Sequence, residues 1–209
     1  GHFDAHQKFP YEDYLLEFYP DNKEKLLALD FGCGPGRMVK RMMSHFEEVH
    51  GVDLVQNNLT FAEQNLKSSG FDEKRYKFFL TDGTGNDLSN IPHLYDFIFS
   101  TICLQHIPVY SIRMTILKQL YSLLKDGGQA SLQMGYGWDN GVYWRDNNFN
   151  ATTSNGGSDI SIPDQSHFAV IEEDMASIGF EVISIEVKGN PHPYLIDYHT
   201  NHLFINLKK

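Results

Sequence analysis

The feature that most constrains the fold is a run of three glycines at alternate positions, Gly32, Gly34 and Gly36. A short apolar stretch over residues 26–31 precedes the run and carries one acid, Asp30, near its end. An amphipathic segment begins directly after the last glycine. This order predicts a buried strand, a glycine turn and a helix, because glycine adopts positive φ and lets a ligand approach the main chain closely. In an open α/β sheet such a turn lies beyond the carboxyl ends of the strands, where ligands bind.

The rest of the chain continues this alternation of strands and helices. Apolar runs and apolar positions at helical spacing distinguish the two. The expected strands cover residues 26–31, 48–53, 75–80, 95–100, 129–134, 180–187 and 203–207, and the expected helices cover residues 11–19, 37–45, 56–68, 108–124 and 166–178. The connector between the last two strands is too short for a helical crossover, so these strands are expected to be antiparallel. We therefore predict a Rossmann-like, doubly wound α/β sheet of seven strands, mostly parallel with an antiparallel last strand.

Residues 135–165 interrupt the alternation. They are rich in Gly, Asn, Asp, Ser and Thr, with aromatic residues between them: Tyr136, Trp138, Tyr143, Trp144 and Phe149. A loop of this length inside a compact domain is usually a functional lid, although its aromatics can also pack on the sheet edge. We expect one domain over residues 1–209, with a lid insertion at 135–165 and the N-terminal helix at 11–19 as a second cover or a packing element.

Charge and composition exclude some classes of partner. The net charge is −10, which argues against a nucleic-acid backbone as the main partner, because phosphate binding needs a basic footprint. No apolar run approaches the roughly 20 residues that span a bilayer, so we expect no membrane partner. The two cysteines, Cys33 and Cys103, lie at the ends of expected buried strands, which favours free thiols in the cytoplasm.

Two further acids are expected at the same edge of the sheet as Asp30. Asp53 ends the second expected strand, and Asp82, followed by Gly83, comes directly after the third. An acid at the end of the second strand is typical of folds that bind a ribose through its hydroxyls. A dinucleotide turn would instead read G-x-G-x-x-G and hold a pyrophosphate on the helix N-terminus. The sequence therefore predicts a nucleoside site for a cationic ligand rather than a phosphate cradle.

These motifs together resemble class I S-adenosylmethionine-dependent methyltransferases, most closely the small-molecule group of methyltransferase type 11. The resemblance rests on Asp30-x-Gly32-x-Gly34-x-Gly36, the two later acids, the strand at 95–100 and the Leu-Lys-Asp-Gly-Gly turn at 124–128. It implies S-adenosyl-L-methionine as the cofactor and S-adenosyl-L-homocysteine as the product. The Asn/Asp-Pro-Pro-aromatic motif of base amino methyltransferases is missing after the fourth strand. This departure lowers the case for a DNA or RNA substrate.

The cofactor can be assigned to residues by its chemistry. Asp30 suits the ammonium of the methionine tail, Asp53 the ribose hydroxyls and Asp82 the adenine amine. A backbone N–H of Gly83 or Thr84 suits a ring nitrogen, and Leu54 and Leu104 are expected to enclose the adenine. We expect Cys33 to be a small buried side chain and not a nucleophile. The full set of predicted cofactor-binding residues is Asp30, Gly32, Cys33, Gly34, Gly36, Arg37, Asp53, Leu54, Asp82, Gly83, Thr84, Ser100 and Leu104.

The expected reaction transfers a methyl group to an oxygen or nitrogen of a small-molecule acceptor, which the lid would enclose. By resemblance His106, after the fourth strand, is the candidate general base, unless it caps the next helix or fixes the loop. Four lesser candidates are His167, His192, His199 and His202. Their spacing does not indicate a metal site, and none is predicted. Two alternatives remain open: a protein or peptide methyltransferase, and a non-catalytic subunit that binds the cofactor. A monomer or a homodimer is expected.

Overall fold

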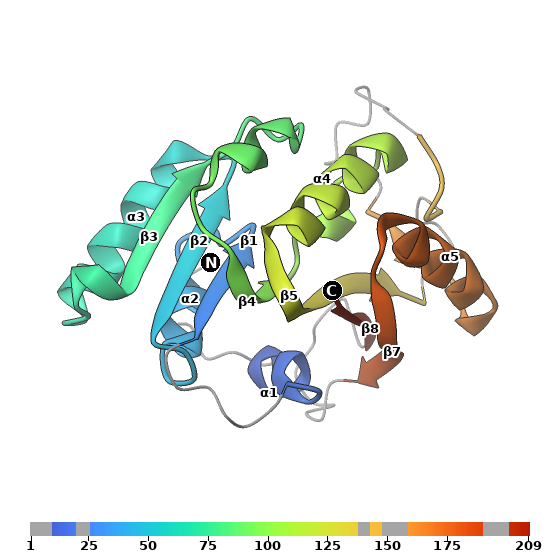
Figure 1. The fold of residues 1–209 in the computed structure, drawn as a ribbon, viewed down its shortest axis with the longest axis horizontal. Coiled ribbons are helices and arrows are strands. Elements are labelled where there is room, and N and C mark those ends of the chain that lie inside the picture. Colours follow the sequence, from blue (N-terminus) through green and yellow to red (C-terminus); the bar gives the residue numbers. More distant parts are fainter. Residues whose placement is uncertain (1–9, 20–25, 138–142, 148–158, 190–200) are drawn as a thin grey trace.

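The computed structural model describes residues 10–19, 26–137, 143–147, 159–189 and 201–209, and the structural statements below concern these residues. The helices are α1 (Tyr11–Leu16), α2 (Arg37–Met42), α3 (Gln56–Ser68), α4 (Tyr110–Leu123) and α5 (Phe168–Ile178) (Figure 1). The strands are β1 (Leu27–Phe31), β2 (Glu48–Asp53), β3 (Tyr76–Leu80), β4 (Tyr95–Ser100), β5 (Leu124–Tyr136), β6 (Ser161–Ile162), β7 (Glu181–Gly189) and β8 (Asn201–Lys208). Short 3-10 turns are η1 (Glu73–Arg75), η2 (Asn86–Asn90), η3 (Leu104–His106) and η4 (Gln165–His167).

The strands form one sheet in the order β3-β2-β1-β4-β5-β8-β7, and the short β6 pairs with β5. Among the described strands, β8 alone runs against its neighbours: it is antiparallel to both β5 and β7, while the other pairings are parallel. This confirms the predicted doubly wound sheet with an antiparallel last strand. The chain turns from one half of the sheet to the other between β1 and β4. Ligands in such sheets bind at this switch point, beyond the carboxyl ends of the strands.

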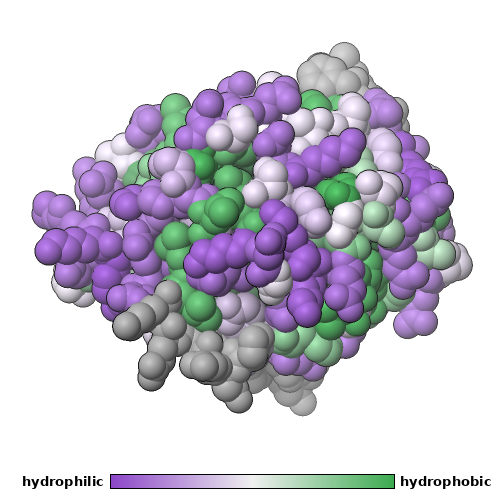
Figure 2. Space-filling model, in the orientation of Figure 1, coloured by the Kyte–Doolittle hydropathy of each residue, from purple (hydrophilic) through white to green (hydrophobic). Residues whose placement is uncertain are grey.

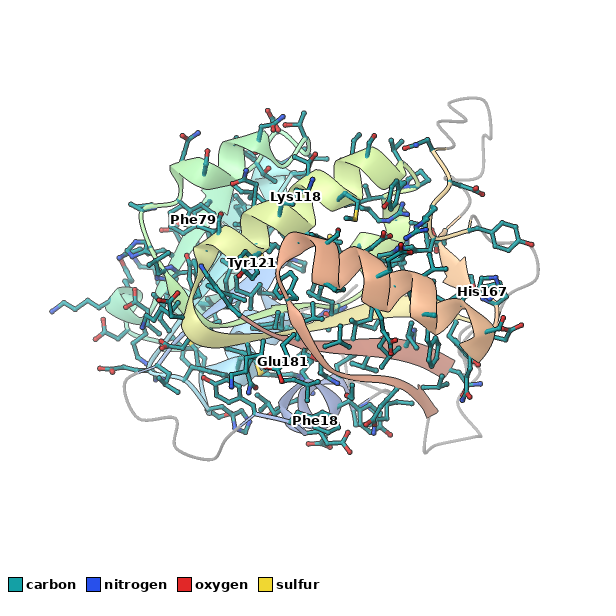
Figure 3. The ribbon with its side chains drawn as sticks, turned by 45° about the vertical axis from the view of Figure 1, so that its right-hand side comes forward. Phe18, Phe79, Lys118, Tyr121, His167 and Glu181 are labelled. Atoms are coloured by element: carbon teal, nitrogen blue, oxygen red, sulfur yellow. The ribbon has the colours of Figure 1, made fainter. Side chains whose placement is uncertain are left out.

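Two apolar clusters cover the two faces of the sheet. Alternate residues of a strand point to opposite faces, and in β1 Ala28 belongs to one cluster while Leu29 and Phe31 belong to the other. The cluster around Ala28 is completed by buried side chains of α1, α2 and α3. The cluster around Leu29 is completed by α4 and α5, which lie side by side across that face in Figure 3. The sheet is thus buried on both faces, as its near-continuous apolar strands require.

The largest differences from the predicted element boundaries are in α1, α2 and β5, and the short β6 was not predicted. The helix α1 ends at Leu16 and not at residue 19, because Pro20 disfavours helical backbone before it and Tyr19 turns in to pack on Phe46 and Phe97 at ring-centroid distances of 5.4 and 4.7 Å. The helix α2 is also shorter, ending at Met42. The strand β5 is longer than the predicted 129–134, since Leu124 already pairs with Tyr95 before a shift in register.

The surface is mainly hydrophilic in the view of Figure 2, with smaller apolar areas between the polar side chains. The exposed large apolar residues include Leu54, Val55 and Leu80, which follow or end the strands β2 and β3. They lie at the edge of the sheet where the predicted nucleoside acids also lie. Among the residues described, no helix has the length and apolar character needed to cross a membrane.

Candidate active site

The glycine turn after β1 is held against the end of β2. The backbone N–H groups of Gly32 and Cys33 both donate to the Val52 carbonyl oxygen, at 2.8 and 2.9 Å. Gly32 and Gly34 have φ values of 80° and 51°, a region that favours glycine. The two glycines differ in what surrounds them. A Cβ on Gly32 would come 2.2 Å from the Cys103 sulfur, whereas a Cβ on Gly34 would meet no atom of the described residues within 4 Å. Gly32 therefore permits close packing, and Gly34 borders open space.

Asp30 places a buried carboxyl group directly beneath this turn. Its side chain is 1% exposed, and its Oδ1 atom accepts no hydrogen bond from the described residues. Burial raises the pKa of Asp30 well above its usual value, and the nearby Asp53 raises it further, while Arg37 acts in the opposite direction. A buried carboxyl group without a donor is costly unless a partner arrives. Asp30 is therefore suited to a cationic or hydrogen-bond-donating ligand group.

Asp53 already serves the protein's own backbone. Its Oδ2 accepts from the Gly34 N–H at 2.8 Å, and its Oδ1 accepts from the Val55 N–H at 2.8 Å and the Asn58 amide at 3.1 Å. A carboxylate offers about four lone-pair positions, so roughly one remains for a ligand. Sequence reasoning missed this structural role, which fixes the glycine turn to the end of β2.

Asp82 lies in an exposed turn after β3. Its Oδ1 accepts from both the backbone N–H and the hydroxyl of Thr84, at 2.8 and 2.7 Å, and these bonds lower the pKa of Asp82. The Gly83 N–H donates to the Thr81 hydroxyl at 3.2 Å. Both backbone donors predicted to reach an adenine ring nitrogen are thus engaged within the turn. The exposed Leu54 lies over Gly83, with Cδ1 3.2 Å from where a Cβ would stand.

Other predicted cofactor-binding side chains are used inside the protein. The Ser100 hydroxyl donates to the Phe31 carbonyl at 2.8 Å and so joins β4 to β1. Leu104 is 2% exposed and belongs to the apolar core, so it does not offer a free face opposite Leu54. Cys33 is buried, and burial raises the pKa of its thiol well above the usual value, in keeping with a packing role. Arg37 is exposed at the start of α2.

His106 lies on η3, after β4, with its side chain about half exposed at 49%. Its Nδ1 atom lies 2.7 Å from Asp159 Oδ1. Because a carboxylate only accepts, Nδ1 carries the proton and leaves Nε2 with a free lone pair in the neutral ring. Asp159 was not predicted from the sequence, since 53 residues separate it from the histidine. A histidine oriented by an acid in this way is able to act as a general base.

The other histidines have different surroundings. His202 is buried on β8, with Nε2 3.2 Å from the Tyr11 hydroxyl, whereas His167 is partly exposed beside Asp164. His192 and His199 lie outside the described residues. Within the described part of the chain, no three or more His, Cys, Asp or Glu side chains gather as metal ligands.

The described part of the predicted lid is anchored to the body of the protein. Trp144 is 4% exposed, and its indole N–H donates to Asp174 Oδ2 on α5 at 2.7 Å. The buried Arg113 of α4 donates to the Trp144 carbonyl, and Arg145 forms ion pairs with Asp174 and its neighbour Glu173. Trp144 therefore packs on the helices and does not line an open pocket. Trp138 and Phe149 lie outside the described residues.

Comparison with known proteins agrees with this arrangement. Residues 28–128 match the family described as "Methyltransferase domain". Residues 28–128, just under half of the chain, therefore carry a methyltransferase domain. The demethylmenaquinone methyltransferase of Bacillus subtilis (strain 168) is 28% identical over 111 residues, or 52% of this chain and 45% of that protein. The ubiquinone biosynthesis O-methyltransferase of Pseudomonas entomophila (strain L48) is 27% identical over 103 residues, or 49% of this chain and 41% of that protein.

The fold of the methyltransferase domain extends beyond the matched segment. The solved structure of an S-adenosylmethionine-dependent methyltransferase from Clostridium acetobutylicum ATCC 824 superposes with a TM-score of 0.64 at 16% identity, over 90% of this chain and 85% of that one. In contrast, the sequence matches span less than half the length of the two curated relatives. The shared fold therefore covers nearly the whole chain, while sequence similarity is concentrated in the β1–β5 half.

The cofactor of this class is S-adenosylmethionine, and the observed geometry fits it. Asp30 Oδ1 is a buried acceptor without a donor, as an ammonium group requires. The space above Gly34 is open to a ligand at the main chain. Asp53 retains a lone pair, and the exposed Leu54 supplies an apolar surface beside it. Two acids and no phosphate cradle match a cofactor that carries a positive charge and no phosphate.

Proposed function

We propose that this chain is a cytoplasmic enzyme that transfers a methyl group from S-adenosylmethionine to an oxygen or nitrogen of a small-molecule acceptor. Residues 1–209 act as a single methyltransferase domain in this proposal. Two features of one turn carry the proposal. Asp30 Oδ1 is a buried acceptor without a donor among the described residues, and the main chain at Gly34, four residues later, borders open space. The two curated relatives named above support the small-molecule class, because their names refer to menaquinone and ubiquinone compounds.

Several of the predicted cofactor residues then have a defined task. Asp30 holds the ammonium of the methionine tail, and the turn from Gly32 to Gly36 lets that tail lie against the backbone. Asp53 accepts from the ribose through its remaining lone pair, and Leu54 packs on the adenine near Asp82. When bound, the cofactor supplies a methyl group that its positively charged sulfur has already activated. The protein's main contribution is therefore alignment of the acceptor with that methyl group.

His106 is proposed to remove the acceptor proton. Asp159 holds the ring through Nδ1 at 2.7 Å, which leaves Nε2 able to receive a proton. A hydroxyl or protonated amine loses its proton as it is methylated, so a base in this position accelerates transfer.

The test uses purified protein and S-adenosylmethionine labelled with tritium in the methyl group. The label is followed into the small-molecule and macromolecular fractions of a lysate. Label in small molecules supports the proposal, and label in proteins would instead support the protein or peptide methyltransferase alternative. Tight binding of S-adenosylhomocysteine by calorimetry with no label in either fraction would support a non-catalytic binding subunit.

A variant control confirms that any label comes from this site. Asp53→Ala removes a hydrogen bond to the cofactor and the support of the Gly34 turn together, so affinity for S-adenosylhomocysteine should fall by about 1–3 kcal/mol or more. Unchanged calorimetric affinity would refute the assignment of Asp53.

A further inference from the structure

A buried polar network lies between α1 and the strands β5 and β8. It links Tyr11 of α1, His202 of β8, Gln133 of β5 and Gln105 of η3 through side-chain hydrogen bonds. Gln105 and Gln133 are fully buried, and His202 is 2% exposed. Burying so many polar groups is unfavourable unless each is satisfied or one serves a ligand.

One backbone group fixes the direction of the bonds around Gln133. The Ile102 N–H donates to Gln133 Oε1 at 2.6 Å, so the other end of this side chain is its amide donor. That amide donates to Gln105 Oε1 at 2.9 Å and lies 2.8 Å from His202 Nδ1, which therefore accepts. Gln105 Oε1 therefore accepts from Gln133, and the Gln105 amide nitrogen, Nε2, points away from that bond.

The amide nitrogen of Gln105 is a hydrogen-bond donor without an acceptor among the described residues, and it is buried. Turning the amide over would set one donor against another, because Gln133 already presents its N–H to this side chain. A buried donor without an acceptor destabilises a fold. A bound molecule that supplied an acceptor atom would satisfy this donor.

The segment that carries Gln105 contacts the glycine turn after β1. Cys103, two residues before Gln105, packs so closely on Gly32 that a Cβ there would come 2.2 Å from its sulfur. Gln133 pairs across the sheet with Phe204, whose ring belongs to the apolar cluster under α1. By strand alternation Asp30 lies on that same face, since Ala28 also belongs to this cluster. The network and the Asp30 carboxyl group, whose Oδ1 has no donor among the described residues, therefore lie on the same face of the sheet.

The turn that carries Gln105 also carries the candidate base. His106 follows it directly and is about half exposed, whereas Gln105 is turned inward. The Gln105 carbonyl accepts from the Ile160 N–H at 2.8 Å, which holds η3 to the segment that contains Asp159. Before the turn, Ile102 has a φ of 49°, unusual for a β-branched residue, and its N–H is the one bound by Gln133. The network thus holds a strained segment that positions both side chains.

We infer that Gln105 determines acceptor specificity by donating a hydrogen bond to an oxygen of the methyl acceptor. The inference rests on the proposed function and narrows its substrate class. The acceptor carries a carbonyl, carboxylate or phenolic oxygen close to the atom that is methylated. An acceptor with only hydrocarbon or ammonium groups at that position would leave the donor unpaired. Gln133 is a positioning residue in this scheme, because it fixes the orientation of the Gln105 amide.

The test compares Gln105→Met with the matched variant Gln133→Met. Both changes preserve side-chain length and remove the amide. Gln105→Met removes an unpaired donor and one hydrogen bond, from Gln133 to Gln105 Oε1, whereas Gln133→Met removes three hydrogen bonds. Gln105→Met should therefore lower the unfolding midpoint by about 4 °C or less, and Gln133→Met should lower it by more. A loss in Gln105→Met as large as that in Gln133→Met would show that the Gln105 amide donor is paired within the protein, and would overturn the inference.

Binding and turnover complete the test. Gln105→Met should bind S-adenosylhomocysteine within about twofold of wild type, because its donor does not serve the cofactor. With the small molecule that wild type labels, its KM should rise by about tenfold or more, with a smaller change in kcat. A large loss of S-adenosylhomocysteine affinity would assign the donor to the cofactor carboxylate and refute the inference.

The two proposals fail in different ways. Unchanged acceptor KM in Gln105→Met, with label still entering small molecules, would refute the inference alone. If wild type binds S-adenosylhomocysteine but labels no small molecule, the proposed function is refuted and the inference with it.

Discussion

Replacing Gly34 by alanine separates folding from cofactor binding. At this position φ is 51°, and an added Cβ would meet no atom within 4 Å in the described part of the chain. The cost to the fold is therefore backbone strain alone, about 1–2 kcal/mol for an L residue in the left-handed region. For a chain of this size that lowers the unfolding midpoint by about 2–8 °C. If the cofactor lies against the turn, the methyl group also enters its space, and such overpacking costs about 1–3 kcal/mol more.

Gly70→Ala is the matched control. Gly70 also has a positive φ of 80° and no atom within 4 Å of its Cβ position, but it follows α3 away from the turn. Both variants should lose similar stability by thermal unfolding. Only Gly34→Ala should lose affinity for S-adenosylhomocysteine by calorimetry, by about fivefold to a hundredfold. Equal, unchanged affinities in the two variants would refute the placement of the cofactor against Gly34.

Three further predictions test the charged groups. An ammonium bound at Asp30 favours the ionised acid, so S-adenosylhomocysteine binding should release up to about one proton and tighten as pH rises; calorimetric enthalpies that do not differ between phosphate and Tris buffers would contradict this. Asp159→Asn should lower kcat by about tenfold or more without weakening S-adenosylhomocysteine binding, because His106 loses its orienting acid; full turnover would remove this role. Burial lowers the pKa of His50 from 6.5 to about 4, against the opposing effect of Glu48. The unfolded chain therefore binds more protons between these values, and urea unfolding should show up to about 3 kcal/mol lost as pH falls through that window, less in His50→Gln; equal pH dependence would refute it.

The fold was predictable because strand and helix periods are local. The strands β2 and β4 and the helix α3 have the bounds expected from apolar spacing, and Gly70 follows α3 with positive φ as a C-cap glycine does. The extension of β5 back to Leu124 was not predictable, since it depends on pairing with Tyr95. Such pairing is a tertiary effect that residues 124–128 alone do not encode.

The candidate site was predictable in its acids but not in their hydrogen-bond partners. Asp30 and Asp53 lie where the spacing placed them, at the ends of adjacent parallel strands. Asp53 supports the Gly34 turn through a contact across 19 residues, and Asp159 orients His106 through a contact across 53 residues. Neither contact follows from a local motif. Leu104 was expected beside the adenine and is instead a core residue. Burial of this kind is decided by packing from several elements, which no single motif contains.

The position of β8 has a consequence for how the protein is made. This strand follows β7 in the chain yet lies between β5 and β7, so neither of them can complete its pairing until β8 has been synthesised. His202 on β8 bonds to Tyr11, 191 residues earlier. A ribosome that emits the chain from its N-terminus thus releases β1 to β4, which pair among themselves, before the strand that completes the pairing of β5 and β7. The half of the sheet formed by β5, β8 and β7 should therefore become protected from hydrogen exchange last as the chain emerges.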